Sequence, residues 1–175
     1  SQPVLKHDGA VMYYLSDESG EKQVWRRTLA TGETRQLTSL RHGVERFALS
    51  GTAQAVAFEA VLWPEELADG SAYREMQPEE KAAWEKELDM RPYVAEKLVY
   101  KMDEWFGMRH GEYSHIGVLS LADGRYEMVA SGETELLYPA WSHDGTMLAC
   151  HGYPHGGARG RMAETFVWTR RSGKL

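Results

Sequence analysis

Residues 138–152, YPAWSHDGTMLACHG, consist of two apolar runs joined by Ser142-His143-Asp144-Gly145. Asp-Gly between two apolar runs is typical of a β-hairpin, because glycine tolerates a positive φ and aspartate can bond the backbone ahead of it. A catalytic cluster is the other interpretation of adjacent Ser, His and Asp residues. Consecutive residues of an extended chain point to alternate faces, so they cannot meet as a catalytic triad does. The pattern therefore predicts a turn.

The same arrangement recurs along the chain and indicates a repeated structural unit. Residues 139–150 (PAWSHDGTMLAC) align with residues 3–14 (PVLKHDGAVMYY), sharing the proline, His-Asp-Gly and the following apolar run. Residues 47–58 (FALSGTAQAVAF) have the same shape, with Ser50 in the place of Ser142 but without Asp-Gly. Each copy predicts two strands joined by this turn.

A second hairpin follows the first in two of the copies. Residues 23–38 (QVWRRTLATGETRQLT) align with residues 115–130 (HIGVLSLADGRYEMVA), so that Gly32 and Gly124 occupy the same turn position. Two successive hairpins give a unit of four short antiparallel strands. Position 7 precedes its counterpart at position 51 by 44 residues, which is the length of one propeller blade.

The next spacing reveals an insertion. Position 51 precedes its counterpart at position 143 by 92 residues, which is 48 residues longer than the first spacing. The strand pattern stops over about residues 64–92, where Glu, Lys and Ala are frequent. Pro78 suits the first position of a helix, and Glu79 and Glu80 suit the positive end of its dipole. We expect a helix over about residues 78–89, inserted within the second unit.

These patterns predict an all-β fold: a partial β-propeller of about three four-stranded antiparallel blades with a short helical insertion. Within residues 1–175 the expected blades span about 3–40, about 44–131 and about 137–175, the last lacking a strand. Propellers usually close with four to eight blades. We therefore expect the chain to be part of a larger protein or to complete its edges through another copy. An unpaired strand edge near residues 164–170 would favour a homodimer.

Composition excludes several classes of protein. Hydrophobic residues make up 42% of the 175 residues, which argues against disorder. The net charge of −6 disfavours non-specific nucleic-acid binding, and no apolar stretch approaches the roughly 18 residues of a membrane span. The start has no signal-peptide pattern and lacks Met. Cys150 is the single cysteine, so an internal disulfide and a cysteine-based zinc site are excluded, and a cytoplasmic location is expected.

Three stretches carry a resemblance to a known family: PAWSHDGTMLA (139–149), LATGETRQLT (29–38) and LVYKMD (98–103). Together with the charged insertion, they resemble the β-propeller of prolyl oligopeptidase family serine peptidases, closest to the bacterial acylaminoacyl-peptidase and dipeptidyl-aminopeptidase-like branch. Gly-Thr-Ala at residues 51–53 departs from the Asp-Gly turn of that family. The resemblance implies a propeller that caps an α/β-hydrolase domain and admits short peptides to it. The nucleophile of such a domain lies in a G-x-S-x-G motif, which this sequence lacks, so no catalytic residue is assigned.

Two pairs of glutamates are candidates for substrate contact. Some dipeptidyl peptidases resembling this family hold the amino terminus of the substrate with a glutamate pair on a propeller insertion. The resemblance makes Glu65 and Glu66, or Glu79 and Glu80, candidates for that role, since carboxylates attract an ammonium group. The other interpretation is a solvated helix start, where acidic residues are common.

Trp105, Phe106, Met108 and Arg109 form a second group of candidates, on an expected loop beside the insertion. Exposed aromatic residues and arginine are typical of contact surfaces. These residues are expected either to face the hydrolase domain or to fill a core.

No metal and no cofactor is predicted. His151 and His155 have the spacing of metal ligands on a helix, but the neighbouring Gly and Pro residues disfavour a helix. Three functional hypotheses remain: a non-catalytic propeller segment of a serine oligopeptidase or exopeptidase, a propeller that serves as a protein-binding platform, and a propeller lyase acting on acidic sugars. The lyase would need a cluster of metal-binding histidines, which the sequence does not reveal.

Overall fold

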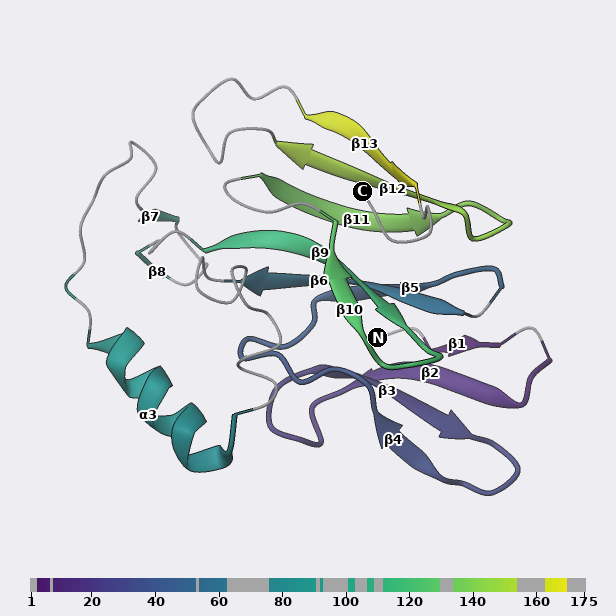
Figure 1. Cartoon of the computed structure of the whole chain (residues 1–175), viewed down its shortest axis with the longest axis horizontal. Coiled ribbons are helices and arrows are strands. Elements are labelled where there is room, and N and C mark those ends of the chain that lie inside the picture. Colours follow the sequence, from purple (N-terminus) through teal and green to yellow (C-terminus); the bar gives the residue numbers. More distant parts are fainter. Residues whose placement is uncertain are drawn as a thin grey trace.

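A computed structural model gives the fold of the chain (Figure 1). It describes residues 3–6, 8–52, 54–62, 76–90, 92, 101–102, 107–108, 112–129, 134–153 and 163–169.

Antiparallel strands form three successive sheets. The first sheet has the order β1-β2-β3-β4, with β1 (Val4–Leu5), β2 (Val11–Ser16), β3 (Gln23–Thr28) and β4 (Thr34–Gln36). The second sheet has the order β10-β9-β6-β5, with β5 (Arg46–Leu49), β6 (Ala55–Leu62), β9 (Tyr113–Ser120) and β10 (Tyr126–Met128). The third sheet has the order β11-β12-β13, with β11 (Glu135–Trp141), β12 (Met147–Tyr153) and β13 (Glu164–Thr169).

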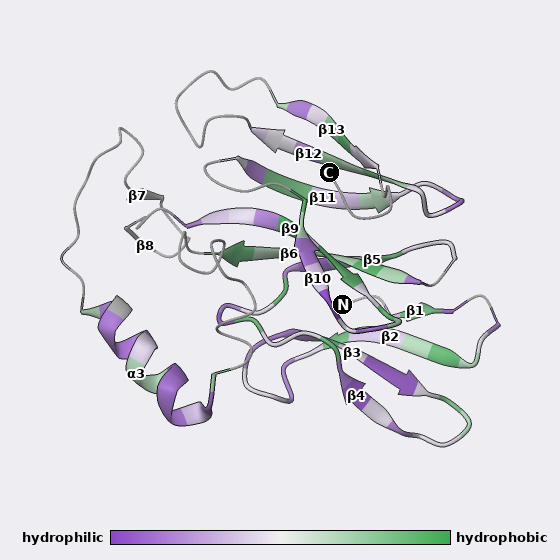
Figure 2. Ribbon diagram, viewed as in Figure 1, coloured by the Kyte–Doolittle hydropathy of each residue, from purple (hydrophilic) through white to green (hydrophobic). Residues whose placement is uncertain are grey.

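The long connection from β6 to β9 carries the insertion. It contains helix α3 (Pro78–Asp89) and a short hairpin of β7 (Lys101–Met102) with β8 (Gly107–Met108). The helix begins at Pro78, as predicted, and most of it is hydrophilic (Figure 2). The predicted fold class is confirmed: the described chain is mostly antiparallel β-structure, with one short helix inserted in the second sheet.

The turns reproduce the repeat in their hydrogen bonds. A backbone N–H donates to the carbonyl five residues later in each sheet, from Lys6 to Val11, from Ser50 to Ala55 and from Ser142 to Met147, at 2.8, 2.9 and 2.8 Å. Gly32 and Gly124 occupy equivalent turns with φ angles of 72° and 73°. Each donates its N–H to the carbonyl four residues earlier. The alignment of these turns in the sequence is therefore confirmed.

Ser142, His143 and Asp144 form the predicted turn. Gly145 has a φ of 69°, which glycine adopts without strain. Asp144 accepts hydrogen bonds from the Ser142 hydroxyl at 2.6 Å and from the Thr146 N–H at 3.1 Å. These bonds lower the pKa of Asp144 to about 2. The carboxylate of Asp144 therefore bonds to Ser142 and Thr146 within the turn rather than to His143.

Packing gives each sheet two distinct faces. We call the face toward the preceding sheet the leading face and the face toward the following sheet the trailing face. All eight residues of β6 are buried. On its leading face Val56 and Phe58 pack in one cluster with Tyr13 and Val24 of the first sheet.

The trailing face of the second sheet packs against the third sheet. Ala55 and Ala57 of β6, with Ile116 and Val118 of β9, form one cluster with residues of the third sheet, namely Leu136, Leu148, Cys150 and Trp168. The second sheet is therefore enclosed on both sides, and it lies between the other two in Figure 1.

Phe58 needs a glycine beside it. Gly117 lies directly opposite Phe58 in the β6–β9 register. A Cβ at residue 117 would lie 2.3 Å from Phe58 Cζ, far inside van der Waals contact. The aromatic ring therefore occupies the space that a side chain at residue 117 would need.

Glu59 ties the second sheet to the third. Its side chain is buried, and its Oε2 accepts the Tyr138 N–H at 2.7 Å. Arg46 Nε lies 3.5 Å from the same oxygen. Burial raises the pKa of Glu59, and the Tyr138 N–H and Arg46 oppose that shift. Tyr138 has a φ of 57° and lies in a register shift between Leu137 and Ala140, which turns its N–H out of the ladder.

His115 is a buried polar residue on the leading face of β9. Its side chain has 0% exposure, and neither ring nitrogen has a hydrogen-bond partner among the described residues. Burial lowers the pKa of His115 to about 4, because the protonated ring loses its hydration. The ring is therefore neutral at neutral pH.

Gly117→Ala is expected to lower the free energy of unfolding by about 1–3 kcal/mol, the usual cost of overpacking a core. Urea denaturation measures it. In a Phe58→Leu background the same substitution should cost less, because the smaller side chain frees space beside residue 117. A Gly117→Ala chain as stable as wild type would contradict the packing described.

Acid should destabilise the chain through His115. The pKa of His115 falls from 6.5 unfolded to about 4 folded, so the unfolded chain takes up the proton first as pH drops. This contribution to the free energy of unfolding is complete above pH 6.5 and is lost toward pH 4, by about 3–4 kcal/mol at most, at about 1.4 kcal/mol per pKa unit.

Urea denaturation across this range should show a smaller loss on acidification in His115→Leu than in wild type. Glu59 acts in the opposite direction, since its raised pKa favours the folded state as pH falls, so the comparison between the two chains isolates His115. Equal pH dependence of both chains would contradict the assignment.

Candidate functional site

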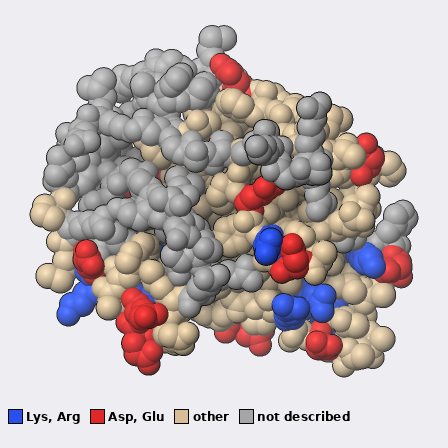
Figure 3. All heavy atoms as spheres, viewed as in Figure 1, with Lys and Arg blue, Asp and Glu red and all other residues tan. Residues whose placement is uncertain are grey.

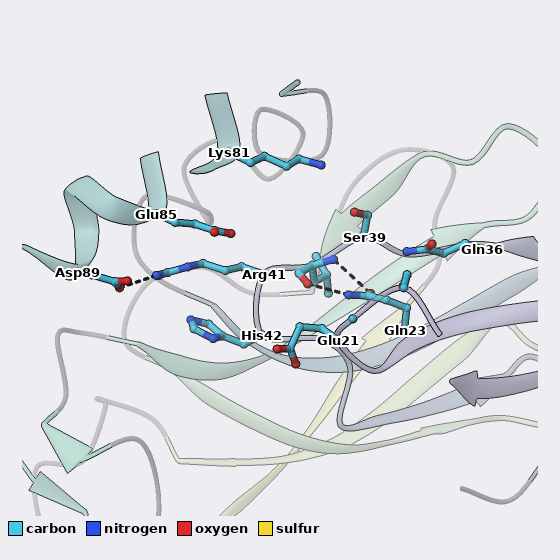
Figure 4. Close-up of a pocket in the computed structure, with 12 residues that line it drawn as sticks. Glu21, Gln23, Gln36, Ser39, Arg41, His42, Lys81, Glu85 and Asp89 are labelled. Carbon is cyan, nitrogen blue, oxygen red and sulfur yellow. Dashed lines mark hydrogen bonds and ion pairs between the residues drawn. The ribbon is translucent and has the colours of Figure 1, made fainter. Parts of the chain in front are cut away.

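A polar cavity lies between helix α3 and the first sheet (Figure 4). Its volume is about 610 Å³, within the range of small-ligand sites. Helix α3 contributes Lys81, Glu85 and Asp89; the chain between β2 and β3 contributes Ser19, Gly20 and Glu21; the strands and the segment after β4 contribute Gln23, Gln36, Ser39, Leu40, Arg41 and His42.

Arg41 joins the helix to the first sheet. Its Nη2 lies 2.8 Å from Asp89 Oδ1, and its guanidinium carbon lies 5.7 Å from the centre of the Trp84 ring. The side chain of Arg41 is 8% exposed, whereas that of Asp89 is 69% exposed. One buried cation thus contacts two residues of α3, and its charged partner remains in water.

Gln23 fixes the segment that carries Arg41. Its buried side chain donates from Nε2 to the Leu40 carbonyl at 2.7 Å and accepts at Oε1 from the Thr38 hydroxyl at 2.8 Å. Thr38 Oγ1 in turn accepts the Val24 N–H at 2.9 Å. This network holds residues 38–40 against β3, so the backbone leading to Arg41 is positioned by buried bonds.

Charges of both signs line the cavity. Arg41 and Lys81 are basic, and Glu21, Glu85 and Asp89 are acidic. Burial, and then the charge of Arg41, lower the pKa of His42, so its neutral form is favoured. Such a lining can orient a polar ligand or a polar protein surface by hydrogen bonds and ion pairs.

Of the glutamates proposed from the sequence, Glu79 and Glu80 are not among the residues that line this cavity. Glu79 and Glu80 are exposed in the first turn of α3, and Glu80 Oε2 accepts the Gln77 N–H at 2.8 Å. That bond provides an acceptor for the Gln77 N–H, one of the backbone donors that have no partner within the helix at its start. Glu65 and Glu66 lie outside the described residues, so the role of either pair in substrate contact stays a prediction.

The aromatic candidates are almost entirely outside the described residues. Trp105, Phe106 and Arg109 lie there, and Met108 ends strand β8, where its backbone pairs with Lys101. Their contact with another domain stays a prediction.

The histidine pair does not form a described site. His151 lies on β12, with its ring 6.4 Å from that of Tyr138 and 5.7 Å from that of Tyr153, and His155 lies outside the described residues. No group of three or more His, Cys, Asp or Glu residues that could hold a metal occurs in the part of the chain that the structure describes.

The sequence pattern does not predict the contacts of Arg41 with helix α3. The one local feature that marks Arg41 is that a basic residue follows the predicted strand near residue 38. Its partner Asp89 is 48 residues away, within the predicted helix, and no periodicity links the two.

The distribution of charge on the face shown in Figure 3 agrees with the net charge of −6. In Figure 3 the visible Lys and Arg side chains lie beside Asp and Glu rather than forming one basic patch. No helix in the described ranges is both long and apolar enough to cross a bilayer.

No protein-family model and no curated protein matches the sequence. Solved structures do resemble the fold. A Pyrococcus horikoshii acylaminoacyl peptidase matches with a TM-score of 0.61 and 12% identity over 99% of this chain. A prolyl endopeptidase (TM-score 0.50, 15% identity) and TolB from Acinetobacter baumannii (TM-score 0.53, 15% identity) also match over 99% of this chain.

The fold is that of a β-propeller segment. This chain corresponds to 24% of the acylaminoacyl peptidase chain, 20% of the prolyl endopeptidase chain and 30% of the TolB chain. The three sheets are therefore propeller blades, and the insertion projects from the second blade.

Replacing Arg41 should increase the local opening of helix α3. Hydrogen–deuterium exchange of the helix is expected to become faster in Arg41→Gln than in Asp89→Asn, because only the first variant also loses the contact with Trp84. An ion pair with so exposed a partner is worth less than about 1 kcal/mol, so Asp89→Asn should accelerate exchange by no more than about fivefold. Glu87→Gln, an exposed carboxylate of α3 outside the cavity, is the control. Unchanged exchange in Arg41→Gln would contradict the role given to Arg41.

Proposed function

We propose that this chain is the non-catalytic propeller segment of a serine oligopeptidase or exopeptidase. The observation that carries the proposal is the match of nearly the whole chain to about a quarter of an acylaminoacyl peptidase chain. The absence of G-x-S-x-G supports it, because the reactive serine would then belong to a separate α/β-hydrolase domain.

The work of such a segment is steric. Three sheets packed face to face form a stiff wall, because both faces of the second sheet are buried and β6 has no exposed residue. A stiff wall beside a catalytic chamber excludes folded proteins and admits short, flexible peptides. In this proposal the blades keep the boundaries expected from the sequence, about 3–40, 44–131 and 137–175.

The insertion is the part of the segment suited to contact with substrate or with the hydrolase domain. Helix α3 is held by Arg41, and the cavity beside it carries charges of both signs. Glu65, Glu66, Glu79 and Glu80 remain candidates for contact with a peptide amino terminus. Trp105, Phe106, Met108 and Arg109 remain candidates for contact with the hydrolase domain.

The same proposal places the protein in the cytoplasm. Cys150, the single cysteine, is buried, and burial raises the pKa of its thiol to about 11. A protonated, enclosed thiol takes little part in disulfide chemistry, which fits a reducing compartment.

A protein-binding platform is the second candidate. The match to TolB, at a TM-score of 0.53, favours it, since the name of that protein is not that of a peptidase. A platform needs no hydrolase domain, so the two candidates differ in what accompanies these residues in the protein.

The isolated chain should not turn over chromogenic aminoacyl or acylaminoacyl substrates, and it should not react with a fluorophosphonate probe for activated serines. Turnover that persists through purification and disappears when one of its serines is replaced would refute the non-catalytic role.

Sequencing the gene beyond the codon for Leu175 separates the two candidates. A G-x-S-x-G motif followed by Asp and then His is expected for the peptidase. A stop codon at that point, or a continuation without the motif, would favour the platform.

A further inference from the structure

Two exposed side chains meet where the second sheet contacts the third. The guanidinium carbon of Arg46, on β5, lies 4.5 Å from the centre of the Tyr138 ring, on β11. The Arg46 side chain is 52% exposed, and Tyr138 is 55% exposed. The two residues are counterparts in the repeat, since they are 92 positions apart, as Ser50 and Ser142 are. The same position in successive sheets thus brings a cation onto an aromatic ring.

The backbone of Tyr138 is strained, and that of its counterpart is not. Tyr138 has a φ of 57° and is the one residue other than glycine with a positive φ in the part of the chain that the structure describes. Arg46 pairs with Glu59 in a regular ladder. In the third sheet the register shifts between Leu137 and Ala140. Strain of this kind persists only where surrounding contacts impose it, and a bulge re-aims a side chain. Here the bulge places the Tyr138 ring against Arg46.

Glu59 holds both members of the pair. Its buried carboxylate accepts the Tyr138 N–H at 2.7 Å and lies 3.5 Å from Nε of Arg46. Neither Nη atom of Arg46 hydrogen-bonds to any residue that the structure describes. A guanidinium has two donor edges, so a contact through Nε leaves the edge with both Nη atoms for a second partner. The orientation of that edge is set before any ligand arrives.

The pair lies at the edge of the two sheets that borders the propeller axis. Strands β5 and β11 are the first strands of their sheets and each forms one edge. Trp141 Nε1 on β11 donates to the Ala48 carbonyl on β5 at 3.1 Å, so the two strands lie side by side. The first strands of propeller blades surround a central channel, which stays open in a complete ring. Both sheets beside the pair belong to this chain, so this edge borders the channel rather than a neighbouring blade.

We propose that Arg46 and Tyr138 form a binding site for a carboxylate group, with the two Nη atoms of Arg46 donating to its two oxygens. The planar fork of arginine matches a carboxylate, and stacking on Tyr138 reduces the freedom that the side chain loses on binding. Glu45, the preceding residue, is exposed, so water screens its repulsion of the ligand.

In the proposed peptidase segment, the ligand is a short peptide that offers its C-terminal carboxylate or an acidic side chain to the channel wall. This use of the site rests on the proposed function, whereas the carboxylate site itself rests on the geometry of Arg46, Tyr138 and Glu59.

An NMR titration of the nitrogen-15-labelled chain at low salt tests the site with three peptides: acetyl-trialanine, its C-terminal amide and acetyl-Ala-Asp-Ala amide. A peptide with a carboxylate should bind in the millimolar range and shift the Arg46 Nε–H and Tyr138 N–H signals. The trialanine amide has no carboxylate and should bind at least about tenfold more weakly. Binding of either carboxylate peptide supports the site, and the stronger one identifies whether a terminal or a side-chain carboxylate is preferred.

Variants assign the binding to the pair. Arg46→Lys keeps a positive charge beside Glu59 but loses the fork, and it should weaken binding by about threefold to tenfold. Tyr138→Leu removes the stacking and should weaken binding by about threefold. Arg35→Lys is the matched control, an exposed arginine on the outer strand β4, and it should leave binding unchanged. Near-UV circular dichroism reports whether each variant keeps the fold.

Three results would overturn the carboxylate site: no binding of either carboxylate peptide, equal binding of acetyl-trialanine and its amide, or signal shifts confined to the cavity beside α3. Unchanged binding in both Arg46→Lys and Tyr138→Leu would overturn it as well. A gene that continues without the peptidase motif would remove the role for peptides but leave carboxylate binding by this chain unchanged, so failure of the site and failure of the proposed function are distinguishable.

Discussion

Burial of both faces of the second sheet positions the other two sheets. Phe58 has 0% exposure and packs toward the first sheet, while Ala57, the next residue back, packs toward the third. A buried phenylalanine contributes about 2–3 kcal/mol, and this one depends on Gly117 to leave it room. The insertion also leaves and re-enters the chain at this sheet, between β6 and β9. The location of α3 and its cavity follows from that packing.

Glu59 fixes the register between the second and third sheets, and the burial of its charge is electrostatically unfavourable. Burial of a carboxylate is unfavourable, and its raised pKa records that cost. The Tyr138 N–H and the guanidinium of Arg46 offset part of it. Arg46 also lies over the Tyr138 ring, with its guanidinium carbon 4.5 Å from the ring centre. An apolar residue at position 59 could fill the space, but it could not accept the hydrogen bond from the Tyr138 N–H in the bulge.

Local features of this fold could be predicted from the sequence, and contacts between distant residues could not. Residues within a few positions of each other determine the Asp144-Gly145 turn and the start of the helix at Pro78. The repeat in the sequence predicts the three sheets. The bond from Tyr138 to Glu59 joins residues 79 apart, and the bond from Arg41 to Asp89 joins residues 48 apart. Both depend on how whole elements pack, which hydrophobic periodicity does not encode. The cavity was missed for the same reason, since its charges come from the helix and from two separate parts of the first sheet.

Native-state hydrogen exchange of the backbone amides tests the two-sided packing most directly. Amides of β6 and β9 that bond to each other should exchange most slowly, at the rate set by unfolding of the whole chain, because both faces of their sheet must be uncovered first. Amides of β12 that bond to β13 should exchange faster, since the described residues of this chain pack against only one face of the third sheet. Exchange in β6 as fast as in β12 would show that the second sheet is not enclosed, and the account of the fold would fail.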